Sequence, residues 1–178
     1  MKEDFVNYRA PILIGDYPFA DVVNDEVVSI LKNNPPAPIS RDRSNVKAYH
    51  TEWDWQKDNI RFKNLKSFIQ NEIENWWKPG TKISGHHDPL VCRNFWANVY
   101  EKGDYAQLHD HKPCQFSFAY FVQSKWYYSP LIIEGTRIAP KVGSFVVFPG
   151  FLKLRVPKHQ YKTPRITLSG NFFIDWKR

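Results

Sequence analysis

Long apolar runs are absent from this chain of 178 residues, and cysteine is scarce. No window approaches the apolar length of a membrane span, and the first residues, Met1 to Asp4, lack the apolar core of a signal peptide. The only two cysteines, Cys92 and Cys114, lie in separate segments and form no CxxC pair, which excludes a disulfide framework. Two isolated thiols favour a reducing compartment. We therefore expect no membrane partner and a cytoplasmic location.

Acidic residues are few relative to basic ones. Lys and Arg number 25 against 18 Asp and Glu, which gives a formal charge of +7. The excess is local, because residues 151–178 contain seven basic side chains and a single acid, Asp175. Such an excess suits a nucleic-acid surface, a site for an acidic small molecule, or plain solubility. Aromatic residues make up 16% of the chain, which argues against a wholly disordered protein.

The hydrophobic pattern predicts helices in the first half of the chain and strands in the second. Residues 21–33 and 62–77 place apolar side chains at helical spacing, and proline follows each segment. From about residue 90, short apolar or alternating segments are divided by Gly and Pro turns. The predicted strands are 95–100, 116–122, 131–134, 144–148, 152–156 and 165–174.

Several short strands of this kind indicate a sandwich or barrel, and a jelly roll suits them best. We expect a mainly β protein with packed helices. It would be one domain, residues 1–178, in which an N-terminal helical and mixed region (1–90) supports a β core (91–178).

Two histidines, His109 and His111, are candidate metal ligands. In an extended backbone, residues two apart share a face, so both imidazoles can point into one cavity. Neutral imidazole is a good ligand for iron, zinc, copper or nickel. Two histidines at this spacing also arise by chance at the surface, and the motif alone favours that interpretation.

The last predicted strand carries one polar face, formed by Arg165, Thr167, Ser169 and Asn171. The Arg165 guanidinium offers a bidentate fork for a carboxylate, and Thr167 can add a hydroxyl donor to the same anion. This face could instead meet water, as one side of an antiparallel sheet usually does. The periodicity does not decide between a cavity and the surface.

Taken in order, these segments resemble the small Fe(II)/2-oxoglutarate oxygenases of marine bacteria and tailed phages. The resemblance covers most of the chain and implies a double-stranded β-helix, the jelly roll of cupin-like proteins. It implies the host cytoplasm as the location if the chain is phage-encoded. The residues that carry it are Trp96-x-Asn98-x-Tyr100, Gly103-Asp104, His109-x-His111, Phe116-Ser117, Gly143 to Pro149 and Arg165 to Asn171, with Asn45 to Ala48 and Thr51-x-Trp53 in the N-terminal half.

The resemblance implies a hydroxylase that uses Fe(II) and 2-oxoglutarate. In such enzymes two histidines and a carboxylate hold the iron. Carried over to this chain, His109 is the first ligand and His111 takes the place usually held by the carboxylate. For the cosubstrate, the resemblance implies that the distal carboxylate binds Arg165, beside Thr167, Asn98 and Tyr100.

One ligand of the relatives is missing from this sequence. The relatives place a histidine eleven residues before the arginine, where this chain has Leu154 among apolar neighbours. His159 is the candidate substitute, although it would reach the metal only through a loop excursion or a shifted register. His86-x-Asp88 has the usual ligand pattern but is expected in a solvated loop, and His50 is expected at the surface.

Three functions remain open from the sequence. The first is a 2-oxoglutarate-dependent dioxygenase with an atypical His-x-His site, acting on a small molecule or peptide that is acidic. The second is a degenerate oxygenase fold without the distal histidine, which serves as a non-catalytic binding module. The third is a basic nucleic-acid-binding protein, with stacking groups at Tyr161, Phe172, Phe173 and Trp176.

Overall fold

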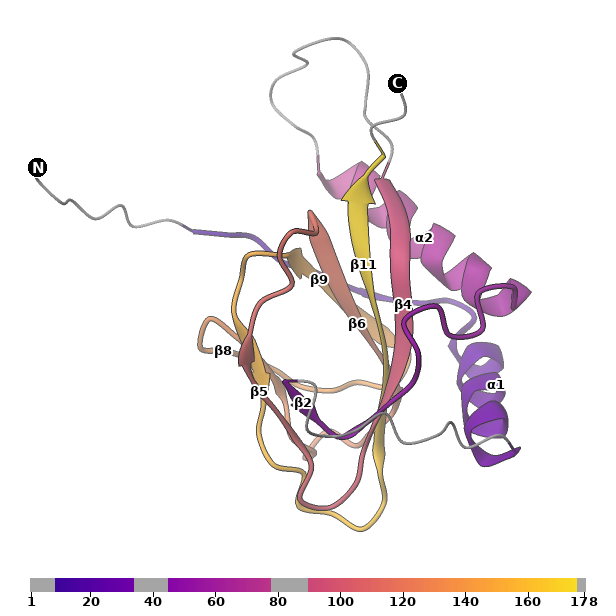
Figure 1. The fold of residues 1–178 in the computed structure, drawn as a ribbon, viewed down its shortest axis with the longest axis vertical. Coiled ribbons are helices and arrows are strands. Elements are labelled where there is room, and N and C mark those ends of the chain that lie inside the picture. Colours follow the sequence, from indigo (N-terminus) through magenta and orange to yellow (C-terminus); the bar gives the residue numbers. More distant parts are fainter. Residues whose placement is uncertain (1–8, 34–44, 78–89, 176–178) are drawn as a thin grey trace, which may run out of the picture.

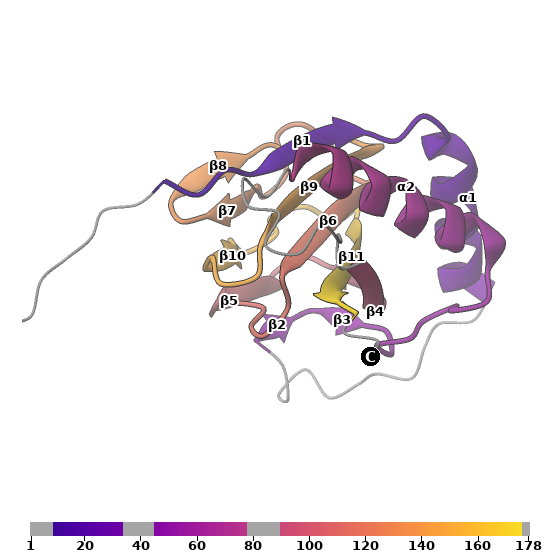
Figure 2. The same cartoon turned by 90° about the horizontal axis from the view of Figure 1, so that it is seen from above.

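The computed structural model describes residues 9–33, 45–77 and 90–175. In this part of the chain, helices α1 (Ala20–Asn33) and α2 (Ile60–Trp76) pack beside two facing β-sheets (Figures 1 and 2). The strands are β1 (Leu13–Asp16), β2 (Val46–Lys47), β3 (Tyr49–His50), β4 (Leu90–Tyr100), β5 (Tyr105–His109), β6 (Phe116–Gln123), β7 (Leu131–Ile133), β8 (Thr136–Ile138), β9 (Ser144–Pro149), β10 (Leu154–Val156) and β11 (Arg165–Ile174).

Among the described residues, the strands form one sheet of six and one of five. The six-stranded sheet has the order β1-β9-β6-β11-β4-β3, and the five-stranded sheet has the order β2-β5-β10-β7-β8. Neighbouring strands within each sheet are antiparallel. Two antiparallel sheets connected in this way form a jelly roll, so the predicted double-stranded β-helix with packed helices is confirmed.

Both predicted helices are present, and α2 shows why its sequence forms one. The side-chain oxygen of Asn59 caps the first turn by accepting a hydrogen bond from the Arg61 N–H at 3.0 Å. Apolar residues at helical spacing then give the helix one buried face. That face packs against the outer side of the six-stranded sheet, in one cluster with side chains of β4, β6, β9 and β11.

Strand β11 has two different faces, and both are buried. It lies between β6 and β4 in the six-stranded sheet. Ile166, Leu168 and Phe172 point toward the helices and join the cluster that α2 covers. Because strand side chains alternate, Arg165 and Thr167 point the other way, into the space between the two sheets. A second apolar cluster fills the rest of that space, with contributions from both sheets.

The N-terminal half contributes more β structure than the sequence pattern predicts. Strand β1 pairs with β9 at one edge of the six-stranded sheet, β3 pairs with β4 at the other, and β2 pairs with β5 in the second sheet. Strand β8 was not predicted either, and for β5 the sequence indicated only an extended backbone around His109. These segments have two to five residues, so their extended form depends on the neighbouring strand rather than on a periodic pattern.

Both helices and both cysteines can be placed within the described residues. No helix in that part of the chain is long and apolar enough to cross a bilayer. Cys114 is buried, Cys92 is half-buried, and both are free thiols.

The packing of α2 leads to a stability prediction. Ile69 is fully buried between α2 and the six-stranded sheet, so Ile69→Ala should lower the free energy of unfolding by about 2–5 kcal/mol. Asn71→Ala, on the exposed side of the same helix, should change it by less than about 0.5 kcal/mol. Urea denaturation followed by circular dichroism measures both. Equal effects of the two substitutions would contradict the described orientation of α2.

Candidate functional site

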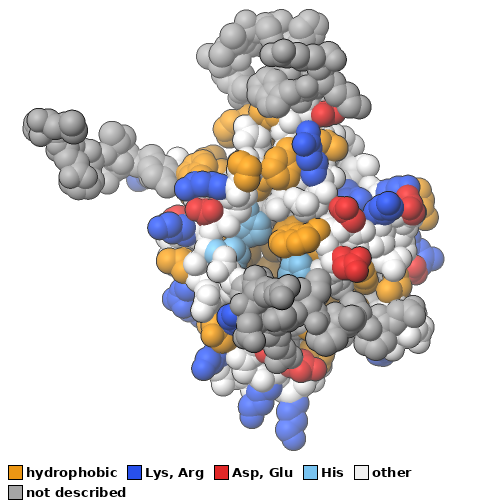
Figure 3. Space-filling model, viewed as in Figure 1, with side chains coloured by type: hydrophobic (Ala, Val, Ile, Leu, Met, Phe, Trp, Pro, Cys, Tyr) orange, Lys and Arg blue, Asp and Glu red, His pale blue; other side chains and the backbone are white. Residues whose placement is uncertain are grey.

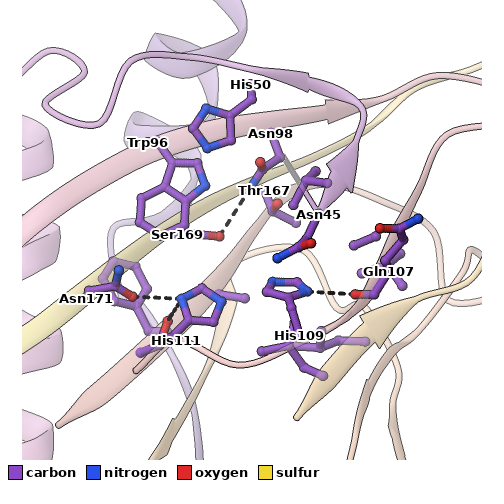
Figure 4. Close-up of a pocket in the computed structure, with 18 of the residues that line it drawn as sticks. Asn45, His50, Trp96, Asn98, Gln107, His109, His111, Thr167, Ser169 and Asn171 are labelled. Carbon is purple, nitrogen blue, oxygen red and sulfur yellow. Dashed lines mark hydrogen bonds between the residues drawn. The ribbon is translucent and has the colours of Figure 1, made fainter. Parts of the chain in front are cut away.

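A cavity of about 500 Å³ lies between the two sheets. Residues of β4 and β11 line it from the six-stranded sheet, and residues of β5 and β10 line it from the five-stranded sheet (Figure 4). The polar face of β11 lines this cavity. The periodicity left open whether that face meets a cavity or bulk water, and in the structure it meets the cavity. Arg165, Thr167, Ser169 and Asn171 are each at most 9% exposed.

The fold brings together the four residues that the resemblance assigns to the cosubstrate. On adjacent strands, Arg165 pairs with Tyr100, and Thr167 pairs with Asn98. All four side chains line the cavity, and all are buried. The Asn98 side chain is held by Ser169 of the adjacent strand, because its N–H donates to the Ser169 hydroxyl oxygen at 3.3 Å. The register between β4 and β11 therefore gathers polar groups that are far apart in the sequence.

Arg165 is a buried cation whose hydrogen bonds are incomplete. Its side chain is 1% exposed, and its guanidinium carbon lies 4.9 Å from the ring centre of Tyr100 and 5.5 Å from that of Phe121. The Nε and Nη1 atoms have no hydrogen-bond partner. Burial lowers the pKa of Arg165, but a guanidinium stays charged at any physiological pH. Burial likewise raises the pKa of Tyr100, against the lowering effect of the Arg165 charge, so Tyr100 is neutral.

His109 and His111 lie side by side at the cavity, with ring centres 5.2 Å apart. The Nδ1 atom of His109 is 2.7 Å from the Gln107 carbonyl oxygen, and that of His111 is 2.9 Å from the Asn171 side-chain oxygen (Figure 4). Because both of these oxygens only accept, each Nδ1 carries the proton. With the proton on Nδ1, the neutral form of either ring has its lone pair on Nε2, which is the arrangement of a metal-binding histidine.

Burial keeps His111 neutral. It lowers the pKa of His111 to about 4, against the raising effect of the hydrogen bond to Asn171. The expectation that His109 and His111 share one strand is only partly correct. Strand β5 ends at His109, and His111 lies in the following loop. There its backbone N–H donates to the Gly150 carbonyl oxygen at 2.8 Å. Asn171 therefore orients His111 in addition to lining the cavity. The alternating polar face of β11 was the sequence signal for Asn171, although it did not indicate the histidine as its partner.

Leu154, which the resemblance places at the position of the missing histidine, lies beside His109. Strands β10 and β5 pair Leu154 directly with His109, and the buried Leu154 side chain lines the same cavity. His159 does not line it. It is completely buried elsewhere, where its Nε2–H donates to the Thr163 carbonyl oxygen at 2.8 Å and its ring contacts Tyr128. Within the described residues, no three His, Cys, Asp or Glu side chains are grouped so that they could hold a metal ion.

The expected surface position of His50 is wrong. Its side chain is 5% exposed, lines the cavity and stacks on Trp96 at 5.7 Å, and Trp96 in turn stacks on His111 at 6.0 Å. The acidic residues that follow His50 in the sequence suggested an exposed loop, but β3 pairs it with Asn98 of β4. The other candidate pair, His86 and Asp88, lies outside the described residues.

No protein-family model and no curated protein matches this chain. Solved structures do match. A collagen prolyl hydroxylase of Paramecium bursaria Chlorella virus-1, solved as a 2-oxoglutarate complex, is 11% identical, with a TM-score of 0.65 over 90% of this chain and 94% of that chain. A prolyl-4-hydroxylase of Pseudomonas putida is 14% identical, with a TM-score of 0.69 over 92% of each chain.

A third similar structure is a prolyl hydroxylase of Trichoplax adhaerens in complex with a peptide fragment of hypoxia-inducible factor. It is 14% identical, with a TM-score of 0.67 over 92% of this chain and 84% of that chain. At these identities the likeness shows the fold alone. The chain shares its double-stranded β-helix with 2-oxoglutarate-dependent hydroxylases, while reaction and substrate must be argued from the cavity.

The position of Leu154 leads to a prediction on metal affinity. Leu154→His should place a third imidazole beside His109 and His111 and raise the affinity for Fe(II) or Co(II). The gain should exceed the roughly 10- to 100-fold contribution of a residue that only supports a ligand. Anaerobic titration, followed for Co(II) by its visible absorption, measures the change. Leu152→His is the matched control, because Leu152 is equally buried but does not line the cavity. No gain for Leu154→His would contradict the proposed position.

Proposed function

We propose that this protein binds 2-oxoglutarate in the cavity between its sheets and belongs with the 2-oxoglutarate oxygenases of phage and marine bacterial type. In this proposal it retains the cosubstrate site of that group and departs from the group at the metal. The incompletely hydrogen-bonded guanidinium of Arg165 carries the proposal. A buried cation with two nitrogens that lack hydrogen-bond partners is costly without an anion, and a carboxylate in the cavity would accept charge-assisted hydrogen bonds from the guanidinium.

The surroundings of Arg165 support a dicarboxylate rather than a larger anion. The guanidinium carbon of Arg165 lies over the rings of Tyr100 and Phe121, so an anion must approach from a direction that these rings leave open. Thr167 stands one pleat further along the same strand face and can donate its hydroxyl to the same carboxylate. With that carboxylate held at Arg165, the 2-oxo acid end is left to the part of the cavity lined by Asn98, His109 and His111.

The cavity is larger than one 2-oxoglutarate requires, since its 500 Å³ falls in the range of sites for drug-sized ligands. We infer that a second molecule, a small compound or one side chain of a peptide, enters beside the cosubstrate. One wall of the cavity is aromatic and is formed by His50, Trp53 and Trp96. Free thiols at Cys92 and Cys114 support a cytoplasmic location for this function.

The residues present fit an iron ion only in part. His109 and His111 would hold Fe(II) through their Nε2 atoms, and Leu154 leaves the third protein ligand out. Two imidazoles bind a divalent ion more weakly than a closed set of three ligands. We therefore propose a 2-oxoglutarate-binding module as the primary function. A working hydroxylase is the second candidate, and the orientation of the two histidines, with both lone pairs available, favours it. When bound, iron would supply the oxidising chemistry.

The proposed cosubstrate site is tested by Arg165→Met. The variant should weaken 2-oxoglutarate binding about a hundredfold or more, because it removes two charge-assisted hydrogen bonds. It should not lower the stability of the ligand-free protein, because methionine keeps the packing of the side-chain stem and removes an unpaired buried charge. Isothermal titration calorimetry and thermal unfolding measure the two effects.

The matched control is Arg155→Met, which removes an exposed arginine of β10 outside the cavity lining. It should change neither binding nor stability. Equal binding of 2-oxoglutarate by the wild-type protein and Arg165→Met would overturn the proposal, as would an absence of binding to the wild-type protein.

Turnover distinguishes the second candidate from the binding module. A hydroxylase should convert 2-oxoglutarate to succinate only with added Fe(II), and the conversion should be lost in His109→Ala while 2-oxoglutarate binding persists. Quantifying succinate by mass spectrometry checks this. Tight 2-oxoglutarate binding with no Fe(II) bound under anaerobic conditions would leave the module as the function.

A further inference from the structure

Two loops at the lower end of the molecule in Figure 1 form a surface that the cavity does not use. They are residues 124–130, between β6 and β7, and residues 157–164, between β10 and β11. The loops are joined, since the Ser129 hydroxyl donates to the Lys158 carbonyl oxygen at 3.0 Å and the rings of Tyr127 and Tyr161 lie 5.0 Å apart. We call these two segments the loop platform.

The loop platform is fixed from beneath by Tyr128 and His159. Both side chains are buried, and their rings contact at 4.7 Å. His159 also donates its backbone N–H to the Asp104 carbonyl oxygen at 2.7 Å, which ties the platform to the turn between β4 and β5. Tyr161 stacks on Tyr128 with ring centres 4.9 Å apart. His159 is therefore accounted for as a structural residue, and the groups above it are held in place before any partner arrives.

Above this base, the platform exposes three aromatic rings. Trp126 is 82% exposed, Tyr127 40% and Tyr161 37%. The ring of Trp126 lies 5.5 Å from that of Tyr127, so the three rings are contiguous. Tryptophan is highly buried on average, and a contiguous exposed aromatic cluster on a fixed surface is typical of a binding site.

The charge of the platform is of one sign. Lys125, Lys158 and Lys162 are exposed on it, and neither loop contains Asp or Glu. The Lys125 ammonium lies 5.8 Å from the ring centre of Tyr127, which places a cation beside an exposed ring. Basic side chains project from this lower end in Figure 3. The adjoining turn carries Lys102 with two acids, Glu101 and the buried Asp104, so the positive field is strongest on the two loops.

We propose that the loop platform binds single-stranded nucleic acid, with bases stacked on Trp126, Tyr127 and Tyr161 and phosphates near the lysines. An acidic peptide would pair with the lysines but would leave three exposed rings without flat partners, whereas every base has a face that can stack. The platform differs from the nucleic-acid surface that the sequence suggested, because Phe172 is fully buried in the core and Trp176 lies outside the described residues. Tyr161 belongs to both.

The test is fluorescence anisotropy with a labelled oligothymidylate at several salt concentrations. Three phosphate contacts on a single strand should give a slope of about −2 in log K against log salt. Trp126→Ala should weaken binding about tenfold, the effect of losing one base stack. Lys162→Gln should reduce the salt slope by about 0.7. Both residues are exposed, so neither substitution should affect folding, and 2-oxoglutarate binding should be unchanged in both variants.

Phe19→Ala and Lys57→Gln are the matched controls, because they remove an exposed aromatic ring and an exposed lysine outside the platform. Neither should change oligothymidylate binding. No binding at low salt would overturn the proposal. So would equal binding by Trp126→Ala and the wild-type protein, or competition by polyglutamate as effective as that by unlabelled oligothymidylate, since either result would mean that the surface recognises charge without bases.

Discussion

A positive charge enclosed between two sheets is the constraint on which the cavity depends. Arg165 retains its charge, and the rings of Tyr100 and Phe121 partly replace water around it. Two nitrogens of the guanidinium have no hydrogen-bond partner, and a carboxylate is the acceptor that binds such donors most strongly. The helices contribute indirectly. Helices α1 and α2 cover the outer face of the six-stranded sheet and keep the apolar side chains of β11 buried there. The inner face of β11 can therefore consist of polar groups.

The sequence predicted the elements whose pattern is periodic and the residues that share one strand face. The helices at α1 and α2 and the whole of β11 follow from spacing alone, and the jelly roll follows from the number of short strands. The pattern could not tell whether the face of Arg165 meets water or a cavity, because that depends on the second sheet. For the same reason the short strands β2 and β3 were missed, and with them the burial of His50, which rests on pairing with β4. Spacing also did not place His159, whose contacts come from another loop.

The two proposed binding regions of the cavity differ in how completely this chain equips them. The polar face of β11 is the proposed cosubstrate site, and His109 and His111 point their Nδ1 atoms at oxygens of Gln107 and Asn171, as metal-binding histidines do. Opposite His109, however, β10 presents the apolar Leu154. In the proposed function, the side chain at this one position of β10 decides whether the cavity offers two or three protein ligands to a metal. The fold does not distinguish the two, since Leu154 packs with the apolar side chains around it.

The two buried faces of β11 also limit how this protein can diverge. Successive residues of β11 point to opposite faces of the sheet. Inserting or deleting one residue in the strand would therefore move Ile166 and Leu168 into the cavity and turn the charge of Arg165 toward the helices. At Gly170 even an added methyl group would lie 2.8 Å from the Asn94 carbonyl oxygen. Insertions and deletions near β11 are therefore expected in the loop that precedes it, residues 157–164. We expect sequence drift along β11 to proceed by exchange of side chains within a face, which alters what the cavity holds while the backbone stays in register.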